Sequence, residues 1–179
     1  YVYECSGEPG RVTGVVAICP VGVLAGDDAA AAKNVDALAA AHAIAELKVQ
    51  PRPVSLAYEA SPVMDIILSA AKEGASLYAV TDPAGVTHRV WEVKREDAVA
   101  AIRAMLDQAP DPVFAGDSAY VAALAGASQI LADEARAAGA YSGKEPFNFA
   151  VAVLFPAAQV SGSAPQVPTG LLTHQVSRF

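Results

Sequence analysis

The residues best suited to chemistry are a glycine, an aspartate and a serine that stand where a short strand is expected to lead into a helix. They lie in the segment Val113-Phe114-Ala115-Gly116-Asp117-Ser118-Ala119-Tyr120. The first N–H groups of a helix have no partner within it, and the helix dipole is positive there, so a helix start can hold an anion. Gly116 permits close approach of a phosphate, which Ser118 and the N–H of Ala119 would contact. Asp117 would bind a metal or accept a proton.

A purely structural explanation of the same residues stays open. An Asp-Ser pair directly before a helix is a common N-cap, which needs no ligand. Two of the histidines have equally plain explanations. His42 lies in an alanine-rich helical segment, and His88 is expected to be a structural partner within a strand that also carries a core residue, Trp91.

The spacing of apolar residues predicts strands and helices in irregular alternation. Strands are expected at Val12–Val21, Val54–Tyr58, Ser76–Val80, His88–Val93, Val113–Phe114, Phe147–Phe155 and Gly170–Val176. Helices are expected at Ala29–Leu47, Val63–Lys72, Arg95–Gln108 and Ser118–Ala138. In the first helix, Leu38, Ile44 and Leu47 are expected to form the buried face. Turn residues at Thr81–Gly85 make the two strands on either side a hairpin.

This order of elements predicts an α/β or α+β fold in which helices pack on a mixed sheet, rather than a doubly wound dinucleotide-binding domain. The sequence contains no internal repeat and no clear linker, so we expect residues 1–179 to form a single domain. The chain begins at Tyr1 with a strand-like pattern, which is typical of a piece of a longer protein.

Composition argues against two kinds of partner. The formal net charge of −7 is unfavourable for binding nucleic acid, which requires clustered Lys and Arg. Hydrophobic residues make up 54% of the chain, yet no stretch is long and apolar enough to suggest a membrane helix. The high apolar content favours self-association or a partner protein. Cys5 and Cys19 are expected to be free thiols, which fits a reducing cytoplasm.

The segment at Gly116 resembles the signature of a bacterial and archaeal family of uncharacterised proteins, Ala-Asp-Gly-His-His-Arg-Tyr-Glu-Thr-Ala-Leu. The matching positions are Gly116, Tyr120, Ala123 and Leu124. Further segments resemble the family in order and spacing: Tyr1-Val2-Tyr3-Glu4, His88-Arg89-Val90-Trp91, Glu145-Pro146-Phe147-Asn148-Phe149 and Leu172-Thr173-His174-Gln175. The Gly-His-His-Arg signature is in turn similar to that of ParB/sulfiredoxin-like proteins, which include nucleotide-dependent free serine kinases. The resemblance implies a corner that holds phosphate and a chain that spans the central part of the family.

The chain departs from that pattern at its charged positions. The signature His-His-Arg falls on Asp117, Ser118 and Ala119, and an earlier Pro-His-Glu-x-Thr segment falls on Ala25-Gly26-Asp27-Asp28-Ala29. A Thr-His-Arg stretch becomes Thr173-His174-Gln175, which keeps the histidine alone. Each charge-assisted hydrogen bond lost in this way costs roughly 1.5–3 kcal/mol, so phosphate binding of the usual kind would be much weaker.

Two functions therefore stand as hypotheses. We expect a non-catalytic relative that binds a small phosphorylated ligand or a partner protein, and a second copy of the chain, in a homo-oligomer, is one such partner. The alternative is a phosphotransferase that uses Asp117, Ser118, His174 and Asp27 with a nucleotide and Mg²⁺, the metal held by Asp27 and Asp117. A Ser-His-Asp triad from the same residues is a weaker alternative, because the sequence has no Gly-x-Ser-x-Gly elbow.

Overall fold

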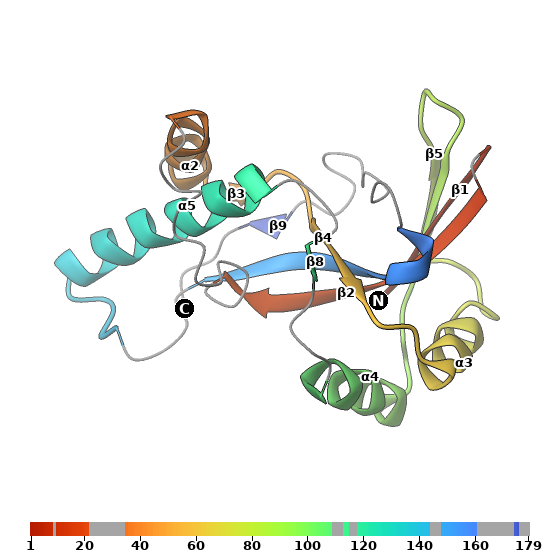
Figure 1. Ribbon diagram of the computed structural model, residues 1–179. Coiled ribbons are helices and arrows are strands. Elements are labelled where there is room, and N and C mark those ends of the chain that lie inside the picture. The colour runs from red at the N-terminus through yellow and green to blue at the C-terminus, as the bar shows by residue number, and fades with distance from the viewer. Residues whose placement is uncertain are drawn as a thin grey trace. The chain divides into compact units, whose positions relative to one another are not determined.

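The residues that the structure describes form one seven-stranded mixed sheet and a separate two-stranded ladder (Figure 1). The structure is a computed structural model, and it describes residues 1–8, 10–21, 35–108, 113–114, 118–143, 148–160 and 174–175. The large sheet has the order β5-β6-β1-β2-β8-β4-β7, and the ladder joins β3 to β9. The predicted α+β fold with a mixed sheet is confirmed.

The strands are β1 (Val2–Gly7), β2 (Gly10–Pro20), β3 (Val49–Gln50), β4 (Val54–Tyr58), β5 (Tyr78–Thr81), β6 (Thr87–Trp91), β7 (Val113–Phe114), β8 (Phe149–Pro156) and β9 (His174–Gln175). The helices are α2 (Val35–Leu47), α3 (Pro62–Ala71), α4 (Glu96–Gln108) and α5 (Ser118–Ala137), with a 3-10 turn, η2, at Ala157–Gln159.

The chain packs into two compact units, which we describe one at a time. Unit 1 consists of Tyr1–Ala17, Ser55–Gly116 and Val153–Gln166, and unit 2 of Ile18–Val54, Asp117–Ala152 and Val167–Phe179. The expectation of a single domain stays a prediction.

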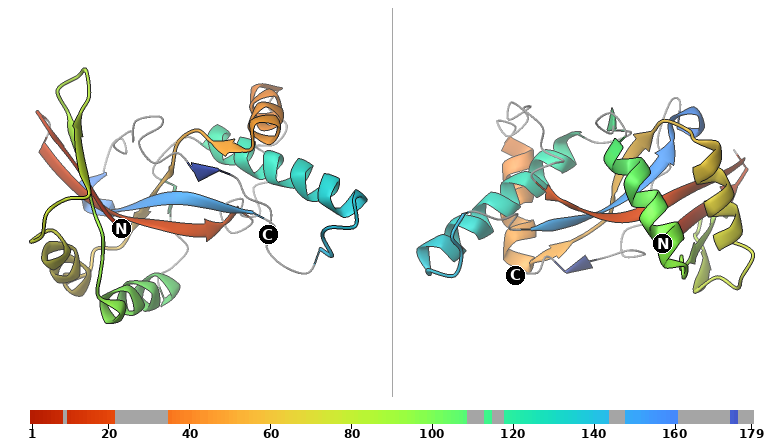
Figure 2. Two further views of the ribbon diagram at one scale, coloured as in Figure 1. Left: turned by 180° about the vertical axis from the view of Figure 1, so that it is seen from behind. Right: turned by 90° about the horizontal axis from the view of Figure 1, so that it is seen from below.

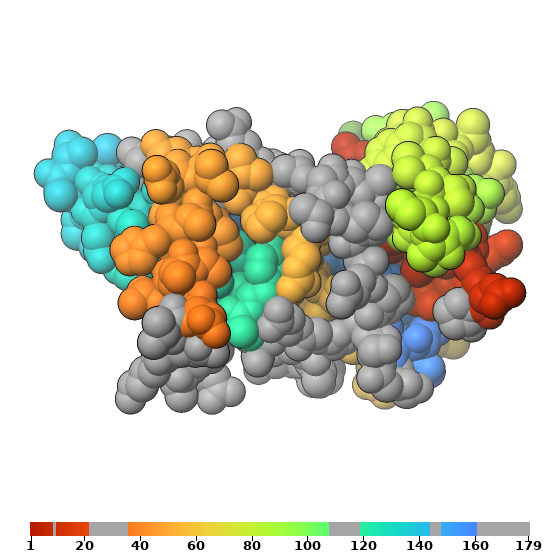
Figure 3. Space-filling model, turned by 90° about the horizontal axis from the view of Figure 1, so that it is seen from above, coloured from red at the N-terminus to blue at the C-terminus, as the bar shows by residue number. Residues whose placement is uncertain are grey.

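In unit 1, β1 lies between β2 and β6 and pairs antiparallel with both. The hairpin of β5 and β6 forms one edge of the sheet and is seen as lime-green atoms in Figure 3. Its turn is fixed by Asp82, whose Oδ1 accepts hydrogen bonds from the N–H groups of Ala84 and Val86, both at 2.9 Å. Gly85 completes the turn with a φ of 81°, which glycine adopts without strain.

Helices α3 and α4 lie side by side against the sheet of unit 1 (Figures 1 and 2). Helix α3 begins with Pro62, one residue before the predicted Val63, and buries Met64 and Leu68. The Ser61 hydroxyl reaches Met105 Sδ of α4 at 3.8 Å. Trp91, at the end of β6, is buried as predicted and donates its indole N–H to the carbonyl oxygen of Gly74 at 3.1 Å.

In unit 2, α2 packs across α5, and the two helices cross in Figures 1 and 3. Ala37, Ala41 and Ala45 are buried, and a Cβ at Gly126 of α5 would lie 3.0 Å from Ala41 Cβ. The predicted buried face of α2 is wrong at two of its three positions, because Leu38 is 53% exposed and Leu47 is 72% exposed. Helices that touch through alanine and glycine approach closely, so the buried face carries the smallest residues rather than the largest.

Candidate functional site

The residues of the predicted site are only partly described by the structure. Asp27, Gly116 and Asp117 lie outside the described residues, so their positions relative to the others are not tested. Ser118 is the first residue of α5, as predicted, and Ala119 is exposed in its first turn. The backbone of His174 is in β9.

The connection from β3 to β4 links β9 with the start of α5. Gln50 of β3 is the antiparallel partner of His174 in the two-stranded ladder. Two residues further on, Arg52 contacts Tyr120 in the first turn of α5. Two of the predicted regions, the His174 strand and the helix start, are therefore each in contact with residues 50–52.

Arg52 and Tyr120 form the contact that defines this corner of unit 2. The guanidinium carbon of Arg52 lies 4.1 Å from the centroid of the Tyr120 ring, a cation–π geometry. The Tyr120 hydroxyl donates a hydrogen bond to the Arg52 carbonyl oxygen, and it also lies 3.2 Å from the Arg52 amide nitrogen. Burial raises the pKa of Tyr120, which keeps its phenol protonated as a donor. The contact thus fixes a positive charge beside the helix end where the dipole is also positive.

Sequence reasoning missed Arg52, a cation that the structure places beside Tyr120 in the first turn of α5. It stands between Pro51 and Pro53 in a connection without a motif. The position of Arg52 depends on Gln50, which is 1% exposed. Gln50 Nε2 donates hydrogen bonds to the carbonyl oxygen of Arg52 at 2.8 Å and to that of Val151 at 2.9 Å. Pairing of this kind between distant segments has no local signal.

The positions that carry the resemblance at this segment have structural roles in α5. Tyr120 holds the connection at Arg52, as described above. Ala123 is 1% exposed and Leu124 is 4% exposed, so both belong to the core of unit 2. Asn148, within another matching segment, is buried and its Nδ2 lies 3.4 Å from the Ser128 hydroxyl of α5. These residues therefore have structural roles in unit 2 that do not require a ligand.

Metal binding has no support in the part of the chain described by the structure. No group of three or more His, Cys, Asp or Glu side chains there could hold a metal ion. The proposed ligands Asp27 and Asp117 are outside that part, and for His174 only the backbone is described. A metal at these three residues stays a prediction.

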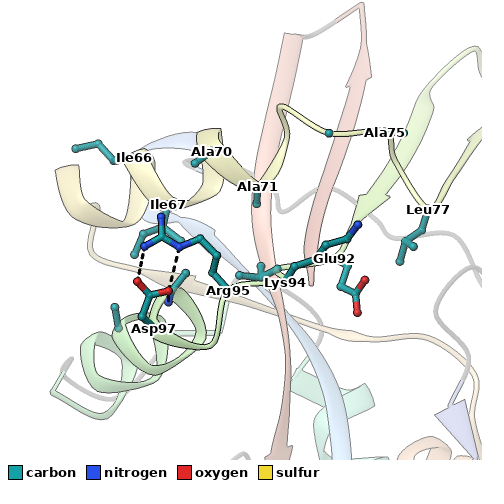
Figure 4. A pocket seen from close by; sticks show the side chains of 14 residues that line it. Ile66, Ile67, Ala70, Ala71, Ala75, Leu77, Glu92, Lys94, Arg95 and Asp97 are labelled. Atoms are coloured by element: carbon teal, nitrogen blue, oxygen red, sulfur yellow. Dashed lines mark hydrogen bonds and ion pairs between the residues drawn. The ribbon is translucent and has the colours of Figure 1, made fainter.

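A pocket of about 460 Å³ lies in unit 1 between α3 and α4 (Figure 4). Its walls are apolar, with Ile67 and Ala70 from α3, Leu77 from the following loop and Ala101 from α4. Pockets of this size are typical of sites for small molecules. The sequence did not indicate it, because its walls come from two stretches of chain, 66–77 and 92–101, that are separated by the β5–β6 hairpin.

The rim of that pocket carries charges that lie in one stretch of chain, residues 92–97. Arg95 and Asp97 pair with each other, with Arg95 Nε 3.0 Å from Asp97 Oδ1, and Figure 4 shows this pair beside Ile67. Glu92 and Lys94 lie toward Leu77 (Figure 4). With its charges at the rim and its walls apolar, the pocket has the character of a binding cavity and lacks an internal acid–base pair.

Three polar side chains of unit 1 form a chain of hydrogen bonds that resembles a catalytic relay. Tyr3 Oη lies 2.7 Å from His88 Nδ1, and His88 Nε2 lies 3.3 Å from Asp82 Oδ2. Tyr3 is 0% exposed and His88 is 2% exposed, so neither can reach a substrate. Burial also raises the pKa of Tyr3, which disfavours a phenolate nucleophile. His88 is thus a buried hydrogen-bonding partner of Tyr3 and Asp82, in agreement with its expected position in a strand.

The fold and the site together define an α+β protein with a polar corner at a helix start. The family model that matches is described as Protein of unknown function (DUF1015), and it covers residues 38–161. The chain therefore belongs to the DUF1015 family. No curated protein and no solved structure matches the chain significantly. None of the helices within the described residues is long and apolar enough to cross a membrane.

Proposed function

We propose that this protein binds a small phosphate-bearing ligand at the start of α5 and acts as a binding or scaffolding protein rather than as an enzyme. The observation that carries the proposal is the position of Arg52, whose guanidinium lies over the Tyr120 ring in the first turn of the helix. A phosphate at this corner would interact with the helix N–H groups and with a guanidinium fork. The resemblance to ParB/sulfiredoxin-like, nucleotide-handling proteins points to the same corner.

The absence of catalysis follows from the chemistry of the substitutions. The signature His-His-Arg is replaced by Asp117, Ser118 and Ala119, so the groups that would stabilise a transferring phosphoryl group are missing. Arg52 provides one positive charge at the same corner, from the connection between β3 and β4 rather than from the signature segment. One cation supports binding of a phosphate, whereas phosphoryl transfer needs several charges placed around the transition state.

Calorimetric titration with ADP and ATP, with and without Mg²⁺, tests the proposal. We expect binding that weakens by about tenfold or more in Arg52→Gln, since a charge-assisted hydrogen bond is lost. Arg103→Gln is the matched control, because Arg103 has an 83% exposed side chain on α4 of unit 1. Thermal unfolding of both variants checks that the corner remains folded.

Two outcomes would overturn the proposal. The first is the absence of nucleotide binding at millimolar concentration, or binding that Arg52→Gln leaves unchanged. The second is Mg²⁺-dependent phosphoryl transfer from a nucleotide to free serine that is lost in Asp117→Asn. That result would favour the alternative, a phosphotransferase with an altered site at Asp27, Asp117, Ser118 and His174.

A further inference from the structure

The face of the unit 1 sheet that carries Glu4 changes from apolar to polar along β1. Residues directly opposite each other in antiparallel strands share a face, and successive residues alternate. Val2 therefore shares a face with its partners Val15 and Trp91. Two residues further on, Glu4 is opposite Thr13 and Arg89.

Glu4 is a buried carboxylate with three cations around it. Only 3% of Glu4 is exposed. Lys72, just after the end of α3, donates from Nζ to Glu4 Oε2 at 3.0 Å and to the Thr13 hydroxyl at 2.9 Å. Arg11 Nε and Arg89 Nη1 lie 3.7 Å and 3.8 Å from the other oxygen, Glu4 Oε1. The cluster is built from three strands and a helix end, all in unit 1.

Neutralising Glu4 requires fewer cations than the cluster contains. Burying a carboxylate costs free energy unless an opposite charge and a hydrogen bond compensate for it. Lys72 alone provides Glu4 with both a positive charge and a hydrogen bond, at 3.0 Å. Arg11 and Arg89 add two positive charges beyond that pair. The carbonyl groups at the end of α3 carry partial negative charge, but Lys72 already stands at that end. The cluster thus holds an excess of positive charge in a chain whose net charge is −7.

The two guanidinium groups have donors to spare. Their distances to Glu4 Oε1 exceed those of ordinary N–H···O hydrogen bonds. Within the part of the chain that the structure describes, neither guanidinium makes a hydrogen bond. Arg11 has a 67% exposed side chain and Arg89 a 39% exposed one, so both can be reached from solvent. Glu4, opposite Arg89 in the ladder, holds the two groups beside one oxygen atom and thus orients them toward a common point.

We propose that Arg11, Arg89 and Lys72 form a binding site for a tetrahedral dianion, the phosphate of a phosphomonoester or a sulfate. Guanidinium forks match such oxyanions bidentately, and Ser6, opposite Arg11 on the same face, adds a hydroxyl. Glu4 acts as a positioning residue: it gathers the cations and lowers the net charge that the ligand meets. This site is in unit 1 and does not depend on the function proposed for the start of α5.

The test is a nuclear magnetic resonance titration with inorganic phosphate and with sulfate, which reads the Arg11 and Arg89 Nε–Hε signals and the Thr13 amide. We expect saturable shifts of these signals in the wild-type protein. Arg89→Gln should raise the Kd by about tenfold or more, because charge-assisted hydrogen bonds are lost. Glu4→Gln should lower the Kd, since glutamine keeps the size of the side chain and an acceptor oxygen beside the cations but removes the negative charge that opposes the ligand. Arg103→Gln and Arg52→Gln should leave the Kd at this site unchanged.

A merely structural role for the cations gives the opposite pattern. In that case neither anion shifts the two Nε–Hε signals in a saturable way, and the proposal is overturned. It is also overturned if Arg89→Gln does not change the Kd, or if Glu4→Gln folds and weakens binding. Should Glu4→Gln fail to fold, Arg11→Gln takes its place, since Arg11 is exposed, and it is expected to raise the Kd.

Discussion

The side-chain amide of Gln50 takes the place of a strand partner for the backbone of Val151. Gln50 Nε2 donates to the Val151 carbonyl oxygen at 2.9 Å, and the Val151 N–H donates to Gln50 Oε1 at 2.7 Å. At the same time the Gln50 backbone pairs with His174. One buried residue therefore joins β8, β9 and the connection to Arg52 within unit 2.

Replacing Gln50 by leucine is expected to destabilise the protein by about 2–4 kcal/mol, because a buried N–H and a buried C=O of Val151 lose their partners. Chemical denaturation measures the change in the free energy of unfolding. Gln129→Leu is the control, since Gln129 is exposed on α5, and it should change stability by less than about 0.5 kcal/mol. Equal effects of the two substitutions would show that the Gln50 bonds contribute little.

Gly14 of β2 is expected to tolerate no larger residue. A Cβ there would lie 2.7 Å from the Leu154 carbonyl oxygen and 2.8 Å from Phe155 Cδ1. Gly14→Ala should therefore destabilise the protein by about 1–3 kcal/mol, as overpacking of a core does. Gly74→Ala is the matched control, because a Cβ at Gly74 meets no atom within 4 Å. A melting temperature that falls equally in both variants would contradict the prediction.

Both cysteines are expected to be unreactive in the folded protein. Cys5 and Cys19 are free, and burial raises the pKa of the Cys19 thiol to about 11 and that of Cys5 in the same direction. The thiolate is the reactive form, so a raised pKa slows alkylation at neutral pH. Titration with a chromogenic disulfide reagent should detect both thiols rapidly in denaturant and neither rapidly in buffer. If one thiol does react in buffer, the variants Cys5→Ser and Cys19→Ser show which of the two it is.

Asp82 is expected to contribute acid sensitivity to the folded state. Hydrogen bonds from the Val86 N–H, then from His88 and the Ala84 N–H, hold the pKa of Asp82 below its ordinary value of 3.8. Because the folded-state pKa is lowered, the stabilisation is complete above the unfolded-state pKa and is lost as the pH falls through the folded-state value. Between about pH 5 and about pH 3, the wild-type free energy of unfolding should therefore decrease more steeply than that of Asp82→Asn. Parallel curves from urea denaturation would rule this contribution out.

Asp117→Asn is expected to tighten the binding of a nucleotide in the absence of Mg²⁺. Asp117 directly precedes the first residue of α5, where its charge opposes a bound phosphate. Two unit charges about 4 Å apart in water interact by about 1 kcal/mol, which corresponds to a gain of roughly fivefold in affinity. Calorimetric titration with a nucleotide in the presence of a metal chelator measures this change in affinity. Weaker binding in this variant would indicate that Asp117 contacts the ligand through a metal.

Most elements could be predicted because local signals mark them. Strand β4 has the predicted bounds, Val54–Tyr58, and α5 begins at the predicted Ser118. Proline and glycine interrupt the apolar pattern at these ends, and such interruptions can be read without knowledge of the fold. The sequence did not predict β3 or η2, because elements of two or three residues carry almost no periodicity.

The buried face of α2 and the candidate site were less predictable for a different reason. Leu38 and Leu47 are exposed because α2 meets α5 at close range through its smallest residues. Which face of α2 is buried is therefore determined by α5, where Gly126 leaves room for Ala41. Nothing near Arg52 in the sequence marks it as a site residue, and only its contact with Tyr120 places it at the start of α5. In both cases the deciding contact joins residues far apart in the sequence.

The alternation along β1 limits which insertions and deletions this chain can accept. Tyr3 faces His88 and Phe155, whereas its neighbour Glu4 faces Lys72 and Arg89 on the other side of the sheet. A shift of β1 by one residue would exchange the two, placing a carboxylate against aromatic rings and a phenol among cations. Loss of a single residue in β1 would thus be more damaging than most substitutions there, and length changes in related sequences should fall outside this strand.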